Sequence, residues 1–261
     1  MMRSTMRALI IAAAAMGLGA TAVQASGEAI ELPARNWSWQ GGWNNVFGSF
    51  DRAQLQRGLQ IYTEVCSGCH SLKLVTYRNL AALGYSEDEV KAYAAAHEVQ
   101  DGPNDDGEMF MRPALPSDRF VSPFANDQAA RASNNGALPP DLSLIVKARK
   151  GGANYIFGIL TGYEEAPEGF VVSEGMNYNR YFAGHQIAMA QPLMDDVVTY
   201  ADGTAATTEQ LAADVTAFLA WTAEPELEER RSMGVKVMIF LAFFTILLIA
   251  VKRRVWADVK H

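Results

Sequence analysis

The sequence contains two cysteines, Cys66 and Cys69, and His70 follows them directly. Positions three apart on a helical turn share a face, so both thiols could reach one edge of a porphyrin. The imidazole of His70, at the end of the same turn, could then reach the iron. A Cys-x-x-Cys pair also occurs in redox disulfides and zinc half-sites, but a histidine placed directly after it is typical of haem attachment. A zinc site would need further ligands, and His97 and His185 show no such spacing. The motif therefore predicts one covalently bound haem c, with Cys66 and Cys69 as the thioether positions and His70 as an axial iron ligand.

The second axial ligand is less clearly indicated by the residues alone. A methionine opposite the histidine gives a relatively high reduction potential and closes the iron to oxygen and peroxide. Met189 lies between two alanines and shortly before Pro192, a setting that suits a loop approaching a flat ring. Most methionines are core or surface residues, so the choice remains open at this point. The other candidates are Met109, Met111, Met176, Met194 and His185.

The N-terminal residues have the pattern of an export signal. Arg3 and Arg7 precede an apolar stretch, and Val23-Gln24-Ala25 supplies the small residues typical of a cleavage site. An uncleaved anchor fits less well because the stretch is short and rich in alanine. A mitochondrial transit peptide would contain more arginine and serine. We therefore expect residues 1–25 to be a signal peptide that directs the chain across a bacterial inner membrane.

A second apolar segment, Val237–Val251, contains no charged residue. Its helix would be about 22 Å long, short of the roughly 30 Å of hydrocarbon in a bilayer. Lys236 and Lys252 can extend their ammonium groups toward the interfaces, so residues 233–254 are predicted to span the membrane with some tilt. Basic residues then place the tail, 255–261, in the cytoplasm and residues 26–232 in the periplasm.

Between the two membrane segments the sequence predicts a mainly α domain with long loops. Leu55, Leu59 and Tyr62 recur at helical spacing, and Thr207 and Gln210 form a capping pattern. No convincing alternation of strands is seen, and the Pro- and Gly-rich region His97–Ala137 is expected to be a loop. The pair Gly151-Gly152 is expected to end the third of four helices. These predicted helices are Asp51–Cys66, Glu87–Ala96, Leu142–Arg149 and Thr208–Thr222.

The charge of the chain is unevenly distributed. A net charge of −7 argues against binding to nucleic acid and allows basic partners. Residues 98–108 contain five carboxylates, residues 164–174 contain four, and neither segment contains Lys or Arg. Such segments are either solvated surface or a docking field that steers a basic protein. The candidate docking residues are Glu98, Asp101, Asp105, Asp106, Glu108, Glu164, Glu165 and Glu168.

Longer motifs, in order along nearly the whole mature chain, resemble the cytochrome c1 family, the haem subunit of the cytochrome bc complex. They are Arg57–Tyr62 leading into the attachment motif, Asp101–Phe110, Asn134–Ser143, Leu160–Tyr163, Gln186–Ala190 and Ala223–Pro225. The resemblance implies a cytochrome c-like haem domain with long loops and one C-terminal transmembrane helix. It also implies that Met189 is the sixth ligand of the iron.

Further residues take their expected roles from the same resemblance. Some bacterial members have a disulfide between pocket loops. This chain has no cysteines for one, so its Met189 loop must be held by packing and hydrogen bonds. Arg149 is expected to pair with a haem propionate and Tyr155 to lie near it. The expected haem pocket consists of Asn134, Pro139, Pro140, Arg149 and Tyr155.

The function implied by the resemblance is electron transfer within quinol–cytochrome c reductase, without quinol binding by this chain. The haem would accept an electron from the Rieske iron–sulfur protein and pass it to a c-type cytochrome. Cytochrome b would be the membrane partner, in a dimeric complex. The alternative is a free-standing tethered cytochrome. Such proteins are normally smaller, so the long stretch of chain between His70 and Met189 counts against this alternative. A peroxidase or gas sensor would need an open sixth position.

Overall fold

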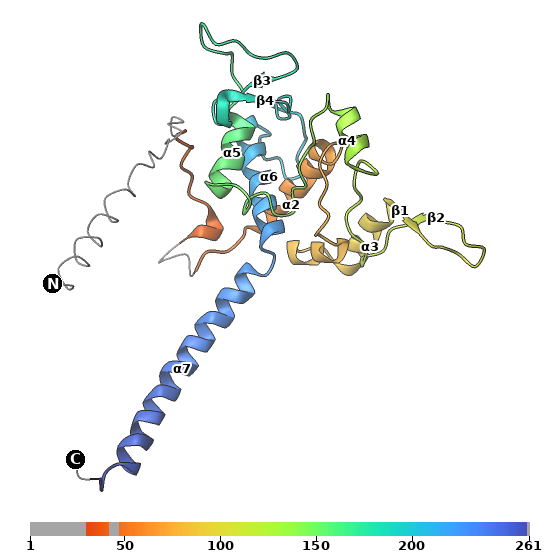
Figure 1. Ribbon diagram of the computed structural model, residues 1–261. Helices are drawn as coiled ribbons and strands as arrows, with labels where there is room; N and C mark the ends of the chain where they lie inside the picture. The colour runs from red at the N-terminus through yellow and green to blue at the C-terminus, as the bar shows by residue number, and fades with distance from the viewer. Residues whose placement is uncertain (1–29, 42–46, 260–261) are drawn as a thin grey trace, which may run out of the picture. The chain divides into compact units, whose positions relative to one another are not determined.

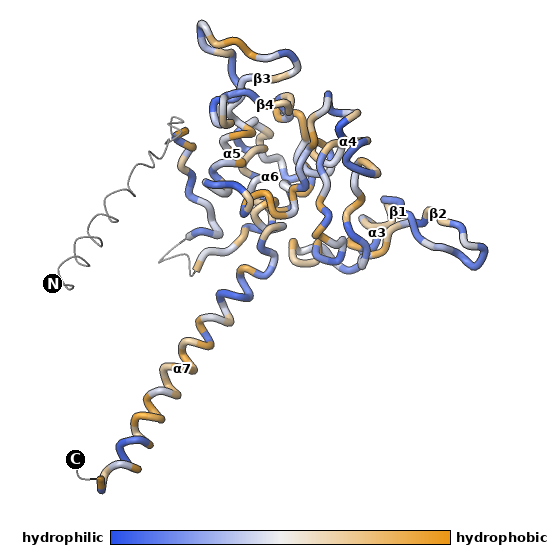
Figure 2. Tube along the Cα trace, viewed as in Figure 1, coloured by the Kyte–Doolittle hydropathy of each residue, from blue (hydrophilic) through white to orange (hydrophobic). Residues whose placement is uncertain are grey.

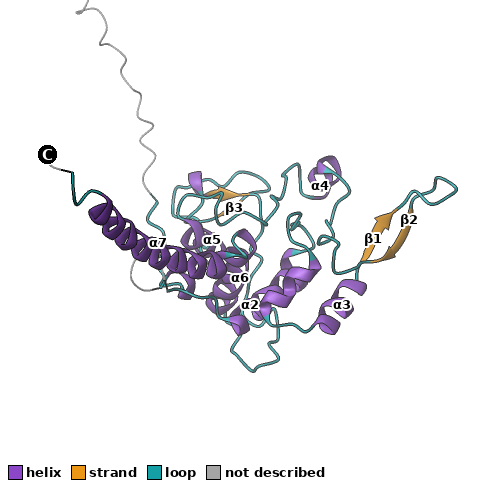
Figure 3. Cartoon of the chain, turned by 90° about the horizontal axis from the view of Figure 1, so that it is seen from below, coloured by secondary structure: helices purple, strands orange, loops and turns teal. Residues whose placement is uncertain are grey.

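The computed structural model describes residues 30–41 and 47–259. The predicted signal peptide, residues 1–25, lies outside the described residues, and its prediction stays untested. Figures 1 and 3 show that the described part consists mainly of helices joined by long loops. The helical elements are η1 (Ser38–Gln40), α2 (Arg52–Ile61), η3 (Tyr62–Cys66), η4 (Tyr77–Leu83), α3 (Glu87–Ala95), α4 (Asp127–Ser133), α5 (Gly152–Thr161), η5 (Ala183–His185), α6 (Thr208–Ala223) and α7 (Leu227–Val255).

Two small antiparallel sheets complete the described secondary structure. β1 (Glu98–Asp101) pairs with β2 (Phe110–Pro113), so that Glu98 lies opposite Pro113. β3 (Asn177–Tyr178) pairs with β4 (Gln186–Ile187). The sheets are short, and the prediction of a mainly α domain with one long apolar C-terminal helix is confirmed.

The core of the domain is built around α2 and α6. The Asp51 carboxylate caps α2 by accepting hydrogen bonds from the first-turn amides, and the Thr207 hydroxyl caps α6 in the same way. The two helices cross closely at Gly58, where a Cβ would lie 2.3 Å from the backbone oxygen of Asp214. Only a glycine allows this approach. Leu55 and Phe218, both fully buried, fill the contact on either side.

Two local predictions between residues 97 and 162 are wrong. Residues 142–149 form successive turns instead of a helix, and the helix α5 begins immediately afterwards. Gly151, with φ of 91°, is the N-cap of α5, so the glycine pair starts a helix instead of ending one. The expected loop His97–Ala137 contains the β1–β2 hairpin and α4. Short strands and seven-residue helices carry too little periodicity to be recognised in a sequence.

The C-terminal helix α7 has 29 residues and is long and apolar enough to cross a membrane. At 1.5 Å per residue it is about 43 Å long, more than the hydrocarbon core requires. Its most apolar window has a mean hydropathy of 2.6 and is wholly exposed. Figure 2 shows this apolar run in the middle of the helix, with hydrophilic residues toward both ends. The structure thus supports one membrane span, whose helix begins six residues before the expected start at residue 233.

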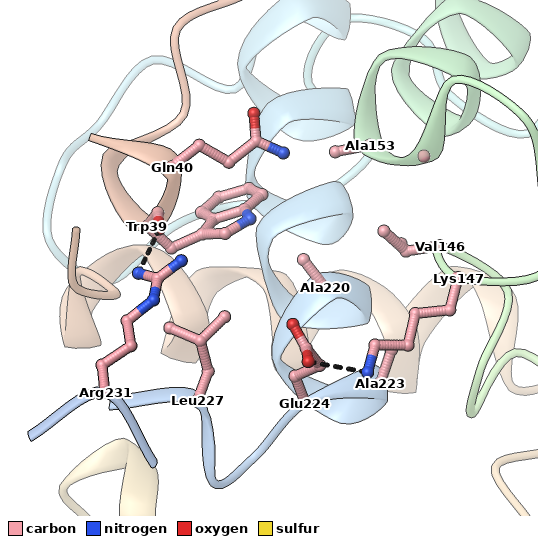
Figure 4. Close-up of a pocket in the computed structure, with 11 residues that line it drawn as sticks. Trp39, Gln40, Val146, Lys147, Ala153, Ala220, Ala223, Glu224, Leu227 and Arg231 are labelled. Carbon is pink, nitrogen blue, oxygen red and sulfur yellow. Dashed lines mark hydrogen bonds and ion pairs between the residues drawn. The ribbon is translucent and has the colours of Figure 1, made fainter. Parts of the chain in front are cut away.

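The first turns of α7 are attached to the haem domain. The Arg231 guanidinium donates hydrogen bonds to the carbonyls of Trp39 (2.7 Å) and Gly48 (2.8 Å). Beside it, an ion pair joins Lys147 to Glu224 (2.7 Å) across a cavity of about 250 Å³ (Figure 4). None of the predicted haem-site residues lines this cavity. The attachment of the domain to its membrane helix therefore depends on residues up to Arg231.

Candidate haem site

The attachment motif lies at the end of a continuous helical segment. α2 passes into the π-helical turn η3, in which the amide of Ser67 bonds the carbonyl of Tyr62 at 2.7 Å. The amide of His70 then bonds the carbonyl of Cys66 at 2.9 Å. Residues 66–70 therefore form one compact turn. Widened turns of this kind are frequent at functional sites because they re-aim side chains.

The two cysteines of the motif are unbonded to each other. Burial, with a smaller contribution from Cys69, raises the pKa of the Cys66 thiol to about 12. A redox-active Cys-x-x-Cys pair needs a lowered thiol pKa, because the thiolate is the nucleophile. No group of three or more His, Cys, Asp or Glu able to hold a metal ion lies among the described residues. A raised thiol pKa is thus the opposite of what a redox-active pair needs, and the histidine that follows the pair favours thioether formation.

The half-buried imidazole of His70 is held in a single orientation. Its Nδ1 lies 2.8 Å from the carbonyl oxygen of Pro140, and since a carbonyl can only accept, Nδ1 donates. The lone pair of the neutral ring is consequently on Nε2, the nitrogen available to a metal. Burial lowers the pKa of His70, despite the opposing hydrogen bond to Pro140, and this favours the neutral form that ligation requires. The structure thus brings together His70 and Pro140, two residues that the sequence predicted for the site.

Two further residues position His70, and no pattern in the sequence indicates either role. The Tyr62 hydroxyl donates to the carbonyl of His70 (3.0 Å), and its buried ring packs against Phe120 and Phe218. Asp141, next to Pro140, accepts hydrogen bonds from the chain directly after His70. These come from the Ser71 hydroxyl at 2.9 Å and the Lys73 amide at 2.7 Å. Although burial opposes it, these bonds hold the pKa of Asp141 below its ordinary value.

Met189 is distinguished from the other candidate ligands by its packing. Of the five candidate methionines, it is the one that packs against the hydrophobic core. Met109, Met111 and Met194 are more than half exposed. The ring of His185 instead stacks on Tyr178 at 5.8 Å. Packing thus favours Met189, as the resemblance implied, and its role as ligand stays a prediction.

The expected pocket residues lie between the end of α4 and the first turn of α5. The Asn134 side chain donates to the carbonyl of Ala130 at the end of α4 (2.7 Å), and Pro139 is half-buried. Tyr155, in the first turns of α5, packs on the core as Cys66 and Met189 do. Arg149 is exposed and forms no ion pair with a described carboxylate. Its guanidinium is therefore available to an anionic group.

The donor set fits haem c. Within the described residues it consists of two free thiols, an imidazole with an unbonded Nε2 and a core-packed thioether, together with a guanidinium that forms no ion pair and is suited to a propionate.

One of the predicted docking acids is not a free surface charge. Asp101 is paired with Arg112, which also pairs with Asp118 at 2.6 Å, so Asp101 is not a free surface charge. The other predicted docking acids are exposed. Those in residues 105–108 lie in the β1–β2 turn, whereas Glu164 directly follows Tyr163 at the end of α5. Figures 1 and 3 draw the hairpin and the α5–β3 region on separate parts of the domain.

Comparison with known proteins gives extensive matches. Cytochrome c1 of Rhodospirillum rubrum is 49% identical over an alignment of 271 positions, which covers 98% of each chain. A protein of Bradyrhizobium diazoefficiens named cytochrome b/c1 is 46% identical over 95% of this chain and 39% of its own length. The mitochondrial cytochrome b-c1 complex catalytic subunit of Candida albicans is 47% identical over 93% of this chain and 83% of its own.

The model of the Cytochrome C1 family matches residues 39–259, a span that includes the attachment motif, the Met189 loop and α7. One covalently bound haem c is accordingly the cofactor of this chain. With the fold, the donor set and the sequence matches in agreement, the chain belongs to the cytochrome c1 family.

Proposed function

We propose that this chain accepts single electrons from a Rieske iron–sulfur protein and passes them to a c-type cytochrome. Its electron-transfer role in a cytochrome bc complex follows from the family and from the relative named as a subunit of that complex. Two observations carry the proposal: the imidazole of His70 is oriented by Pro140, and Met189 packs against the core. A haem closed by His and Met supports electron transfer and excludes oxygen chemistry.

Each residue of the site then has a defined task. Cys66 and Cys69 would hold the haem through thioethers, and His70 and Met189 would supply the imidazole and the thioether that ligate its iron. Arg149 neutralises a propionate, with Tyr155 beside it, and Asn134, Pro139 and Pro140 form the pocket wall. When bound, the haem supplies a reversible one-electron couple, and no residue of this chain needs to move a proton of quinol.

The proposed assembly places α7 beside cytochrome b. In the Bradyrhizobium relative, the name cytochrome b/c1 combines the two proteins in one chain, which supports this partnership. We infer a dimeric complex with the haem domain, residues 26–232, in the periplasm. Lys252, Arg253 and Arg254 at the end of α7 favour a cytoplasmic C-terminus in a bacterial inner membrane.

Truncation after Arg231 tests whether α7 serves only as an anchor. The shortened chain keeps the buried Leu227 and both hydrogen bonds of Arg231 to the haem domain. We expect it to be a soluble periplasmic protein with covalently bound haem, measured by cell fractionation and haem staining. A cut after Glu226 removes those contacts and is expected to lower the yield of folded haem protein. Failure of the Arg231 truncation to bind haem would mean that the membrane segment is required for the domain to fold.

Removing carboxylates in two matched sets tests where the acceptor cytochrome docks. Glu164, Glu165 and Glu168 lie within the five residues after Tyr163, whose hydroxyl contacts the Met189 loop, so we propose this segment as the principal landing surface. Changing all three to Gln should lower the second-order rate of oxidation by a basic c-type cytochrome and flatten its salt dependence. A Debye length of about 10 Å at 0.1 M salt already screens much of the steering.

The control set removes the same number of charges from the β1–β2 turn, as Asp105→Asn, Asp106→Asn and Glu108→Gln. Stopped-flow oxidation of the reduced chain across a salt series compares both variants with the wild type. The haem spectrum and potential should be unchanged in both. An equal effect of the two sets would assign the steering to the general field of the domain. A wild-type salt slope in both would place docking elsewhere.

A further inference from the structure

The backbone of the Met189 loop is held by two side chains that are not among the predicted site residues. The carbonyl oxygen of Met189 accepts a hydrogen bond from the Tyr163 hydroxyl (3.0 Å) and a second from the side-chain amide of Asn177 (3.3 Å). Both lone pairs of one carbonyl are therefore used, by donors 14 residues apart in the sequence. The backbone of Met189 is therefore held from two directions.

Tyr163 is attached to the rigid part of the domain. It lies two residues after the end of α5, whose buried residues Ile156 and Phe157 belong to the core. The site is crowded at Gly162, where a Cβ would lie 2.5 Å from the Tyr181 ring.

Asn177 is connected to the same helix. It lies in β3, whose pairing with β4 leads the chain to Met189. Two residues further on, the fully buried Asn179 donates to the carbonyl of Ile159 in α5 at 2.8 Å. The two donors to Met189 are thus both fixed to the C-terminal end of α5. The chain's two cysteines are both in the attachment motif, so these ties are non-covalent.

We propose that Tyr163 and Asn177 are positioning residues that keep the Met189 sulfur on the iron. The inference rests on the proposed role of Met189 as axial ligand. If the carbonyl loses a donor, the loop gains alternative positions and the fraction of molecules with an open sixth site increases. The apparent affinity for an external ligand rises in proportion to that open fraction.

The test measures carbon monoxide binding by the reduced full chain in detergent. Tyr163→Phe removes one oxygen atom and should increase the apparent affinity roughly fivefold, the effect of one neutral hydrogen bond. Asn177→Ala provides an independent variant with a similar expected increase. The control is Tyr181→Phe, because that hydroxyl forms no hydrogen bond within the described residues, and it should behave as the wild type. Haem content should be equal in all variants, and the ferric charge-transfer band of methionine ligation should weaken only in the first two.

Met189→Ala, measured alongside, separates the possible outcomes. If it binds carbon monoxide strongly while both positioning variants match the wild type, the inference is overturned and the ligand assignment remains. If Met189→Ala itself leaves the affinity unchanged, Met189 is not the ligand, and the proposed function loses its main support. A gain of affinity in Tyr181→Phe equal to that in Tyr163→Phe would also overturn the inference, since the hydrogen bond would then be irrelevant.

Discussion

Met189→Lys is expected to keep the haem covalently attached while lowering its reduction potential by on the order of a few hundred millivolts, a large part of the range over which axial ligands act. A thioether favours ferrous iron, whereas an amine is a harder ligand that favours the ferric state. Cys66, Cys69 and His70 lie in a separate turn and are untouched by the change. A redox titration of the purified chain, with haem content measured in the same sample, gives the result.

The matched control is Met194→Lys. This side chain belongs to the same segment, is 59% exposed and should carry a lysine without any change in potential. An unchanged potential in Met189→Lys would remove Met189 as a ligand and leave Met176 and Met194 to be examined in the same way.

Asp214→Leu is expected to lower the free energy of unfolding by about 3–5 kcal/mol, the usual cost of removing one partner of a buried ion pair. The Asp214 side chain is fully buried in α6 and pairs with Arg57 of α2 at 2.8 Å. An arginine guanidinium is not deprotonated in proteins, so Arg57 stays charged when Asp214 is removed. Thermal or urea unfolding of the full chain in detergent measures the loss.

Two further variants identify the cause. The double variant Arg57→Met with Asp214→Leu removes both charges and should recover much of the loss, because Asp214→Leu alone leaves the largely buried Arg57 with only the partly exposed Asp202 as its ion-pair partner. Glu87→Gln breaks an exposed pair with Lys91 and should leave unfolding unchanged. If the double variant were as unstable as Asp214→Leu, packing and not charge would be responsible.

The predictions that the structure confirms depend on local patterns. The expected helix Asp51–Cys66 is α2 with its π-helical continuation, and the expected helix Thr208–Thr222 is α6 to within one residue. The apolar run Val237–Val251 lies within α7. Caps, hydrophobic periodicity and an uncharged run act between residues a few positions apart, and a single sequence contains all of that information. The attachment motif is of the same kind, since its chemistry is confined to one turn.

The tertiary structure decided which distant residues meet. Gly151 starts α5 because its left-handed backbone turns the chain, a feature that looks the same in sequence as a helix end. Arg112 neutralises Asp101 through the pairing of β1 with β2. The segment 98–108 therefore carries less net negative charge than its five carboxylates suggest. Tyr163 reaches Met189 across 26 residues because α5 and the β3–β4 pair hold both ends of the loop. A hydrogen bond to a backbone carbonyl requires no particular residue at the acceptor position, and it therefore leaves no trace there in the sequence.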